Sequence, residues 1–362
     1  MALSHQIDTL IEAAIERRVF PGAVVLIAQG DCICHHQAYG TTMYDADGSL
    51  PVQPDTIYDI ASLTKMFTAT AALRLGDAGL LELDAPVAAY LPGFGAPKVT
   101  IRNLLTHTSG LDIRLSALRH AGRDALLETV YHLKPAHPPG SVVAYTNVNS
   151  LLLGEIVARL HGASLDQALH DLVIGPLRLR DTCFCPPGDL KPRIAPTEVD
   201  EAWRGGLVHG SVHDESAHAL GGIAGHAGLF SSAADIYRFC SAWLAAADGP
   251  PGGHKCATAE PLLRPETARR AMASQTQGLS AACGLGWMID RPNFMGPAPT
   301  GIVGHTGFTG PAMVIARASR TIVVVLSNRV YPRRSAPAHH SVTSGLISLA
   351  LSKLQIRFPS VP

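Results

Sequence analysis

The sequence predicts an α/β (α+β) protein with one antiparallel sheet, built from both chain ends and flanked by helices, beside an all-helical lobe. Runs of β-branched residues occur at 22–39 and again at 284–327. Between them, residues 75–200 show mostly helical periodicity and loops. Strands at both ends with helices between them favour a single sheet assembled from the two termini. The expected parts are a sandwich domain from residues 1–74 and 221–362, and a mainly helical lobe with cleft-lining loops from residues 75–220.

The composition is that of a compact globular protein without a charge imbalance. Among 362 residues, 47% are hydrophobic and 16% are charged, and 29 Lys and Arg balance 29 Asp and Glu. A neutral chain without a basic patch is not expected to bind nucleic acid or an anionic membrane surface. No apolar run approaches the roughly 20 residues that a transmembrane helix needs. The sequence leaves the oligomeric state open.

The N-terminal segment predicts a surface helix followed by a β-hairpin. Apolar residues recur at helical spacing from Ile7 to Ile15, with Ser4 as the expected N-cap. The segment lacks the basic and apolar regions of a signal peptide, so we expect a cytoplasmic protein. Residues 22–29 and 32–39 flank a two-residue turn, Gly30-Asp31, which predicts the hairpin.

Seven cysteines fit a reducing compartment, because their odd number argues against a full disulfide framework. Two C-x-C pairs, one of them Cys32 and Cys34 followed by two histidines, raise the alternative of a metal site. Residues i and i+2 of a strand share a face, and structural metal sites usually use C-x₂₋₄-C spacings. We therefore favour packed strand thiols and expect neither a metal nor a cofactor.

The remaining elements follow from periodicity and from Gly and Pro punctuation. Helices are expected at 62–77, 80–91, 99–106, 117–133, 150–160, 165–172 and 233–246, with a final amphipathic helix at 341–354. Strands are expected at 284–289, 301–306, 313–318 and 321–327, with a Pro-rich loop at 185–204 and a flexible turn at 249–253. A cleft between the two lobes is the natural place for a site.

Ser62 and Lys65 begin the first of these long helices, in the sequence A-S-L-T-K-M-F. At positions i and i+3 their side chains share one helix face. The helix N-terminus offers free N–H groups and a positive dipole end, which favour a developing oxyanion. A hydroxyl beside an amine that acts as a base is the general arrangement for covalent acyl transfer. The S-x-x-K pattern alone is short and recurs by chance.

Two further motifs follow in order: Tyr145-Thr146-Asn147 ahead of a helix, and His305-Thr306-Gly307 on an expected sheet strand. With these three elements the chain resembles the serine β-lactamase and penicillin-binding protein superfamily. It is most similar to the class C β-lactamase-like branch, which includes family VIII carboxylesterases, D-amino-peptidases, DD-peptidases and cell-wall amidases. Further segments similar to this branch or its subgroups are 101–111, 195–198, 212–217, 225–234, 284–287, 304–310 and 327–332. The resemblance implies a β-lactamase/transpeptidase-like fold.

The resemblance also implies a role for each matching residue. Ser62 would be the nucleophile, and Lys65 would take its proton, alone or with Tyr145. Tyr145 would return the proton to the leaving group. Asn147 would hydrogen-bond the substrate's acyl side chain and Lys65. The N–H groups of Ser62 and Phe308 would form the oxyanion hole, with His305, Thr306 and Gly307 on the strand along which the substrate lies.

One departure from the family pattern concerns substrate charge. Penicillin-directed members mostly carry lysine where this chain has His305, and a neutral histidine offers no fixed cation to a substrate carboxylate. Neutral esters or amides are therefore favoured over anionic β-lactams, and the apolar Phe308 supports the same interpretation.

The loop from 205 to 228 is rich in Gly and His. His213 and Asp214 are expected to fix the shape of this loop or to contact substrate. A metal cluster is the alternative for the residues His209, His213, Asp214, Glu215, His218 and His226, but they lack tetrahedral ligand spacing. His107 is expected to brace the turn that follows its helix.

The favoured hypothesis is a cofactor-free serine hydrolase, a carboxylesterase, that acts on a small-molecule ester, amide or peptide through a Ser62 acyl-enzyme. The alternative is an amidase, D-amino-peptidase or DD-carboxypeptidase acting on cell-wall peptides, with weak or no β-lactamase activity. A non-catalytic binding module and a metal-dependent hydrolase are further hypotheses, and the intact Lys65 and Tyr145 count against the binding module.

Overall fold

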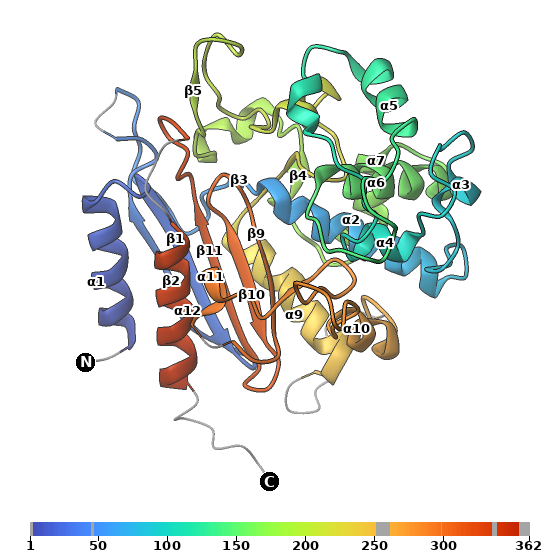
Figure 1. Cartoon of the computed structure of the whole chain (residues 1–362). Coiled ribbons are helices and arrows are strands. Elements are labelled where there is room, and N and C mark those ends of the chain that lie inside the picture. The colour runs from blue at the N-terminus through green and yellow to red at the C-terminus, as the bar shows by residue number, and fades with distance from the viewer. Residues whose placement is uncertain (1–2, 45–46, 251–260, 298, 335–338, 355–362) are drawn as a thin grey trace.

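In the computed structural model, which describes residues 3–44, 47–250, 261–297, 299–334 and 339–354, a six-stranded antiparallel sheet has the order β2-β1-β11-β10-β9-β8. The strands are β1 (Gly22–Gln29), β2 (Cys32–Gly40), β8 (Met288–Ile289), β9 (Ile302–Thr306), β10 (Ala312–Ala316) and β11 (Thr321–Ser327). The prediction of one sheet from both ends is confirmed, because β1 pairs with β11 from Ala23 opposite Ser327 to Gln29 opposite Thr321 (Figure 1).

Each face of the sheet packs against different helices. Alternate residues of β1 point to opposite sides, as a strand requires. Ala23, Val25 and Ile27 join the cluster formed with α1 (Leu3–Glu16) and α12 (His340–Leu354). Val24 and Leu26 belong to the larger cluster that includes α9 (Ala233–Asp248). Helices α1 and α12 therefore cover one face of the sheet, and α9 covers the other (Figure 1).

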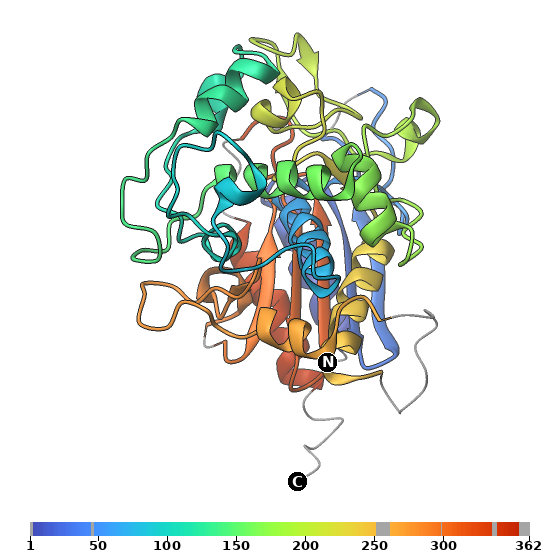
Figure 2. The same ribbon diagram turned by 90° about the vertical axis from the view of Figure 1, so that its right-hand side faces the viewer.

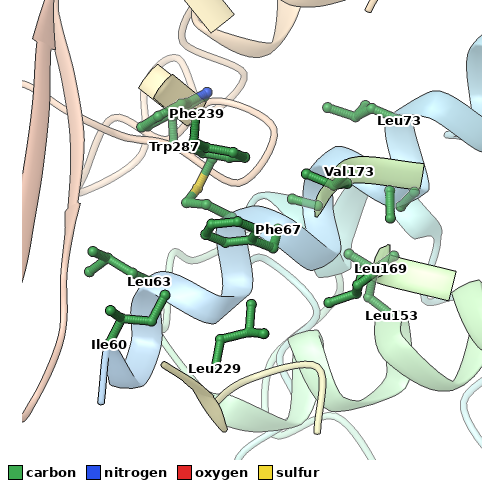
Figure 3. Packing of buried hydrophobic residues seen from close by; sticks show 14 of the residues in the cluster. Ile60, Leu63, Phe67, Leu73, Leu153, Leu169, Val173, Leu229, Phe239 and Trp287 are labelled. Carbon is green, nitrogen blue, oxygen red and sulfur yellow. The ribbon is translucent and has the colours of Figure 1, made fainter. Parts of the chain in front are cut away.

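Helix α2 (Thr64–Asp77) is the centre of the larger cluster. It is buried on several sides because small and apolar residues surround it, as the sequence predicts. Phe67 stacks on Phe239 of α9 with ring centroids 4.4 Å apart, while Leu153 and Leu169 belong to the same cluster and come from the helical lobe (Figure 3). Seen from the side, α2 lies in front of the sheet (Figure 2), and it packs against α6 (Asn147–His161). The turn at its start is thereby held at the junction of the two parts.

The rest of the chain forms the helical lobe and short connecting elements. The remaining helices of the chain are α3 (Val87–Tyr90), α4 (Ile101–Leu105), α5 (Arg123–Tyr131), α6 (Asn147–His161), α7 (Leu165–Leu169), α8 (Glu215–Ala219), α10 (Pro265–Ala271) and α11 (Pro292–Met295). Short strands are β3 (Tyr58–Asp59), β4 (Cys183–Phe184), β5 (Val199–Asp200), β6 (Gly206–Leu207) and β7 (Leu229–Ser231). Turns of 3₁₀-helix include η1 (Ala61–Leu63), η2 (Leu115–Leu118) and η4 (Gly188–Arg193), and η3 (His170–Ile174) is a π-turn.

Several expected boundaries are wrong, and local backbone chemistry explains them. The helix expected at 117–133 divides into η2 and α5, because Gly122 between them has a positive φ of 73°. The strand expected at 284–289 shortens to β8, since Gly286 has a φ of 90°. The expected N-cap Ser4 lies inside α1. The turn expected at 249–253 extends beyond the described residues. Within the described ranges, no helix is long and apolar enough to cross a membrane.

Candidate active site

Ser62 and Lys65 form a direct pair at the start of α2. Ser62 lies in the turn η1, and Lys65 Nζ donates a hydrogen bond of 2.8 Å to its Oγ. Lys65 is 2% exposed and donates a second bond of 3.0 Å to the carbonyl of His226. The helical spacing read from the sequence thus brings the hydroxyl and the amine into contact. His226 was considered only as a possible metal ligand, whereas here its backbone carbonyl holds Lys65.

Tyr145 lies beside this pair and is held between two histidines. Its ring centroid is 5.1 Å from Lys65 Nζ. The ring of His107 lies 4.7 Å away and that of His305 lies 5.9 Å away. The Nδ1 of His107 is 3.1 Å from Nδ2 of Asn149, so His107 connects the Tyr145 segment to α6. The phenol itself is 47% exposed and therefore accessible to a ligand.

Burial and the nearby charge of Lys65 keep both histidines neutral. They lower the pKa of His107 and that of His305 to about 3. His305 has an exposed fraction of 0%, and its Nδ1 is 2.9 Å from the carbonyl of Thr306. The expectation that the His305 side chain meets substrate is therefore not met in this structure, because protein surrounds the ring.

Gly307 is required for a close approach between two segments of the site. A Cβ at this position would lie 2.7 Å from the carbonyl oxygen of Ile60 and 3.2 Å from Cβ of Ala61. The end of β9 therefore packs directly against the turn that carries Ser62.

Asn147 and Asp214 form part of the cleft wall. Asn147 Nδ2 donates to Asp214 Oδ2 at 3.4 Å, whereas Lys65 donates to Ser62 and His226. The bond from Asn147 to Asp214 thus takes the place of the expected bond between Asn147 and Lys65. Asp214 is the N-cap of α8 and accepts from the N–H of Ala217. Burial alone would raise the pKa of Asp214, but His226 and the hydrogen bonds to this carboxylate hold it well below its usual range.

His213 supports the loop and also lines the cleft. Its Nε2 is 2.8 Å from Glu198 Oε2, and the residue is 5% exposed. Its ring stacks on Phe308 with centroids 5.7 Å apart. Arg329 lies over the same phenyl ring at 4.9 Å and donates to the Phe308 carbonyl at 2.9 Å. Phe308 is therefore fixed from two sides, although its side chain is 49% exposed.

Two backbone N–H groups in this cleft have no internal acceptor. Within the part of the chain that the structure describes, neither Ser62 N nor Phe308 N donates a hydrogen bond. Both residues line the same cavity. Free donors from two segments around one cavity have the composition of an oxyanion hole.

The main cavity has a volume of about 440 Å³ and unites most of the expected residues. It is lined by Ser62, Tyr145, Asn147, His213, Asp214 and Phe308. Sequence reasoning missed Asp112, Arg114 and Arg334, which also line it. The first two directly follow the family-like segment 101–111, and that position was the available signal.

A second cavity of about 290 Å³ adjoins Tyr145 on another side. Thr306, Trp287 and Arg291 are among its lining residues. Arg291 Nη2 donates to Cys283 Sγ at 3.2 Å, and the buried indole N–H of Trp287 has no acceptor among the described residues. Tyr145 lines both cavities. A group bound in the second cavity would therefore lie next to the phenol.

The histidines of the loop from 205 to 228 make protein contacts of their own. His209 contacts the carbonyl of Ile194, His218 packs against Trp203, and His226 contacts Ser216. Among the described residues, no three His, Cys, Asp or Glu side chains are grouped to hold a metal ion.

Comparisons with protein families and with curated proteins both show similarity over most of the chain. A family model described as Beta-lactamase matches residues 7–344. A protein of Escherichia coli strain K12 named "Putative D-alanyl-D-alanine carboxypeptidase" is 31% identical over 366 residues, which cover 90% of this chain and 82% of that protein. A protein of the same name from Salmonella schwarzengrund strain CVM19633 is 30% identical with the same coverage.

Solved structures share the architecture. Simvastatin synthase LovD from Aspergillus terreus is 20% identical, with a TM-score of 0.76 and coverage of 98% of this chain and 99% of that one. EstCE1, described as a hydrolase with promiscuous acyltransferase activity, is 22% identical, with a TM-score of 0.73 and coverage of 95% and 98%. A class C β-lactamase from Rhodobacter sphaeroides is 24% identical, with a TM-score of 0.72 and coverage of 96% and 100%. At these identities the similarity shows a shared fold.

Proposed function

This chain belongs to the β-lactamase family of serine hydrolases, and we propose that it hydrolyses carboxylic esters of small molecules through an acyl-enzyme on Ser62. The observation that carries the proposal is the 2.8 Å bond from Lys65 Nζ to Ser62 Oγ. This pair opens onto a cavity that also holds Tyr145 and two free N–H groups. A nucleophile, a base and an oxyanion hole around one cavity are what acyl transfer requires.

Acylation transfers one proton and exchanges one bond. Ser62 Oγ bonds to the ester carbonyl carbon, and its proton passes to Lys65 in its neutral form. The carbonyl oxygen becomes an oxyanion that accepts hydrogen bonds from the N–H groups of Ser62 and Phe308. As the carbon–oxygen bond of the leaving group breaks, Tyr145 relays the proton to that oxygen and an alcohol departs.

Deacylation repeats these steps with water in place of Ser62. Water attacks the acyl carbon while its proton passes to the same Lys65 and Tyr145 pair. When the second tetrahedral intermediate breaks down, Ser62 Oγ recovers a proton and a carboxylic acid leaves. Asn147, on the wall of the same cavity, is in place to contact the acyl group.

The electrostatics of the site support a neutral ester. His305 stands where penicillin-directed members carry lysine, and burial with the charge of Lys65 lowers its pKa to about 3. The position therefore offers no cation to a carboxylate on a β-lactam. We expect weak or no β-lactamase activity.

The test is hydrolysis of p-nitrophenyl acetate and butyrate by the wild type and by Ser62→Ala, Lys65→Ala and Tyr145→Phe. The first two variants should lose about 10³-fold or more of kcat, as removal of one member of such a unit typically does. Ser141→Ala and Lys134→Ala, at exposed positions of the helical lobe, are the matched controls. Undiminished turnover by Ser62→Ala would reject the proposal. A burst of one equivalent without turnover in the wild type would support a binding module instead.

A second candidate, a carboxypeptidase acting on peptides, is favoured by the cavity that contains Arg291. A peptide ending in D-alanine releases a leaving group with a carboxylate, and a guanidinium suits that anion. Arg291 lines the cavity next to Tyr145, which protonates the leaving group in this scheme. Release of D-alanine from an N-acyl-D-alanyl-D-alanine peptide would distinguish the two candidates. Arg291→Gln should abolish that release yet leave hydrolysis of p-nitrophenyl acetate unchanged.

A further inference from the structure

Asp59 is a buried carboxylate at the centre of the candidate active site, and the mechanism above gives it no step. It is 2% exposed and lies two residues before the turn η1 that carries Ser62. Its backbone is fixed because β3 pairs with β7, with Asp59 opposite Phe230. A carboxylate in such a place needs hydrogen-bond donors, since burial of an unsatisfied charge is costly.

Both carboxylate oxygens accept backbone N–H groups from separate segments. Oδ1 accepts from Ala61 at 2.8 Å, and Oδ2 accepts from His213 at 2.7 Å. Ala61 has a φ of 45°, in the left-handed region that residues with a Cβ rarely adopt. This conformation immediately precedes Ser62. The bond to Asp59 Oδ1 therefore stabilises an unfavourable backbone at the nucleophile.

The main chain of Asp59 binds the other side of the site. Its carbonyl oxygen accepts a hydrogen bond of 2.8 Å from Thr309 Oγ1. Thr309 is 1% exposed and directly follows Phe308. The second segment held by the carboxylate, at His213, contributes the ring that stacks on Phe308. These three hydrogen bonds of Asp59 thus reach a direct neighbour of Ser62, a direct neighbour of Phe308, and a residue packed on Phe308.

We propose that Asp59 is the positioning residue that sets the separation and direction of the two oxyanion-hole donors, the N–H groups of Ser62 and Phe308. It does so from beneath the cavity and contacts no substrate. The inference rests on the proposed function, because the two donors matter only where an oxyanion forms. Donors that serve a developing charge lower the transition state and leave substrate binding nearly unchanged.

The first test is Asp59→Asn, which keeps the shape and replaces one of the two acceptor oxygens by a donor. We expect kcat for p-nitrophenyl acetate to fall about 10- to 100-fold with KM within about 2-fold, the pattern of misplaced oxyanion donors. Affinity for phenylboronic acid, whose adduct with a serine mimics the tetrahedral intermediate, should fall by a similar factor. Calorimetry measures that affinity without turnover.

A second pair of variants approaches the same contact from Thr309. Thr309→Val removes the hydroxyl that binds the Asp59 carbonyl at nearly constant volume, and Thr309→Ser retains it. The valine variant should show the same fall in kcat at constant KM, and the serine variant should restore most of it. This pair keeps the inference testable if Asp59→Asn does not fold, as judged by circular dichroism.

The outcomes separate this inference from the proposed function. Wild-type kcat and boronate affinity in both Asp59→Asn and Thr309→Val would overturn the positioning role, while loss of activity in Ser62→Ala would leave the proposed function standing. A raised KM with unchanged kcat would also overturn it, because that pattern indicates lost substrate binding. Failure of the wild type to bind phenylboronic acid would count against both.

Discussion

At the scale of single residues, burial decides what the two histidines beside Tyr145 contribute. His107 and His305 are almost fully buried, and each has a pKa lowered to about 3 by burial and by the charge of Lys65. They pack against the phenol without adding a cation of their own. The two rings next to Tyr145 are thus neutral.

Folding stability should therefore depend on pH through these histidines. In the unfolded chain they take up protons below about pH 6.5, whereas in the folded chain they resist protonation until the pH is near 3. The unfolded state binds more protons between these values, so stability falls as the pH falls. Urea unfolding at pH 7.5 and pH 5 should show a smaller difference for His305→Gln than for the wild type. His132→Gln, at an exposed histidine, should keep the wild-type difference.

Gly307 gives a second prediction at this scale. Because an added Cβ would lie 2.7 Å from the Ile60 carbonyl, Gly307→Ala should separate β9 from the turn of Ser62. We expect a loss of about 1–3 kcal/mol of stability, typical of overpacking, together with a marked fall in kcat. Thermal unfolding and ester hydrolysis measure the two effects. Gly188→Ala is the control, since a Cβ there meets nothing within 4 Å; equal effects in both variants would contradict the explanation.

The sequence located the residues whose chemistry follows a local pattern. Ser62 and Lys65 share a helix face, so their contact follows from helical spacing. Asp59 and the backbone contact of His226 escaped sequence reasoning for a physical reason. Asp59 acts by accepting N–H groups, one of them from a residue 213 − 59 = 154 positions away, and such pairing through space has no signature in one sequence.

At the scale of elements, long strands could be predicted and short ones could not. The bounds of β11, Thr321–Ser327, match the expected range because six of its seven residues are apolar or β-branched and turn signals flank the strand. The hairpin of β1 and β2 could be predicted equally well from the sequence. By contrast, β3 and β7 contain two and three residues. Tertiary packing around Ser62 creates them, and periodicity has nothing to detect over such lengths.

The hairpin of β5 and β6 joins two walls of the main cavity through Trp203. Arg119 and Arg204 lie 5.5 and 5.2 Å from its ring, and His218 of α8 packs edge-on at 5.2 Å. Arg119 directly follows η2, and η2 packs against α8. The indole therefore holds the wall formed by residues 112–116 against the wall formed by residues 213–215.

Removing the indole should loosen the cavity without affecting the catalytic pair. Trp203→Ala loses cation–π contacts that are each worth about 0.5–1 kcal/mol at exposed sites. We expect kcat/KM to rise for p-nitrophenyl octanoate relative to the acetate, because the walls can separate around a longer acyl chain. Trp203→Phe, which keeps a ring in place, should stay near the wild-type ratio. An unchanged ratio in the alanine variant would show that these walls do not select chain length.

At the scale of the whole molecule, the two faces of the sheet have different roles. One face and α2 support the cavity, whereas α1 and α12 cover the opposite face. Ile11 and Leu346 are fully buried between those two helices and the sheet. Changes there should alter stability and leave the site geometry intact.

Ile11→Ala and Leu346→Ala test this separation. Each should lower the free energy of unfolding by about 2–5 kcal/mol, the usual range for such truncations in a core. At a temperature where both variants remain folded, kcat for p-nitrophenyl acetate should stay within about 2-fold of the wild type. A large fall in kcat would mean that the far face of the sheet communicates with Ser62.

The pairing of β1 with β11 also bears on how a cell makes this protein. Ala23 and Ser327 are partners separated by 327 − 23 = 304 positions. At translation rates of about 5–20 residues per second, the first strand waits about 15–60 s for its neighbour to leave the ribosome. Throughout that interval an apolar strand edge stands open in the nascent chain, which is the condition that chaperones recognise. Ser62, the proposed nucleophile, is thus synthesised early, and it meets the segment of β9 and Phe308 only when synthesis is nearly over.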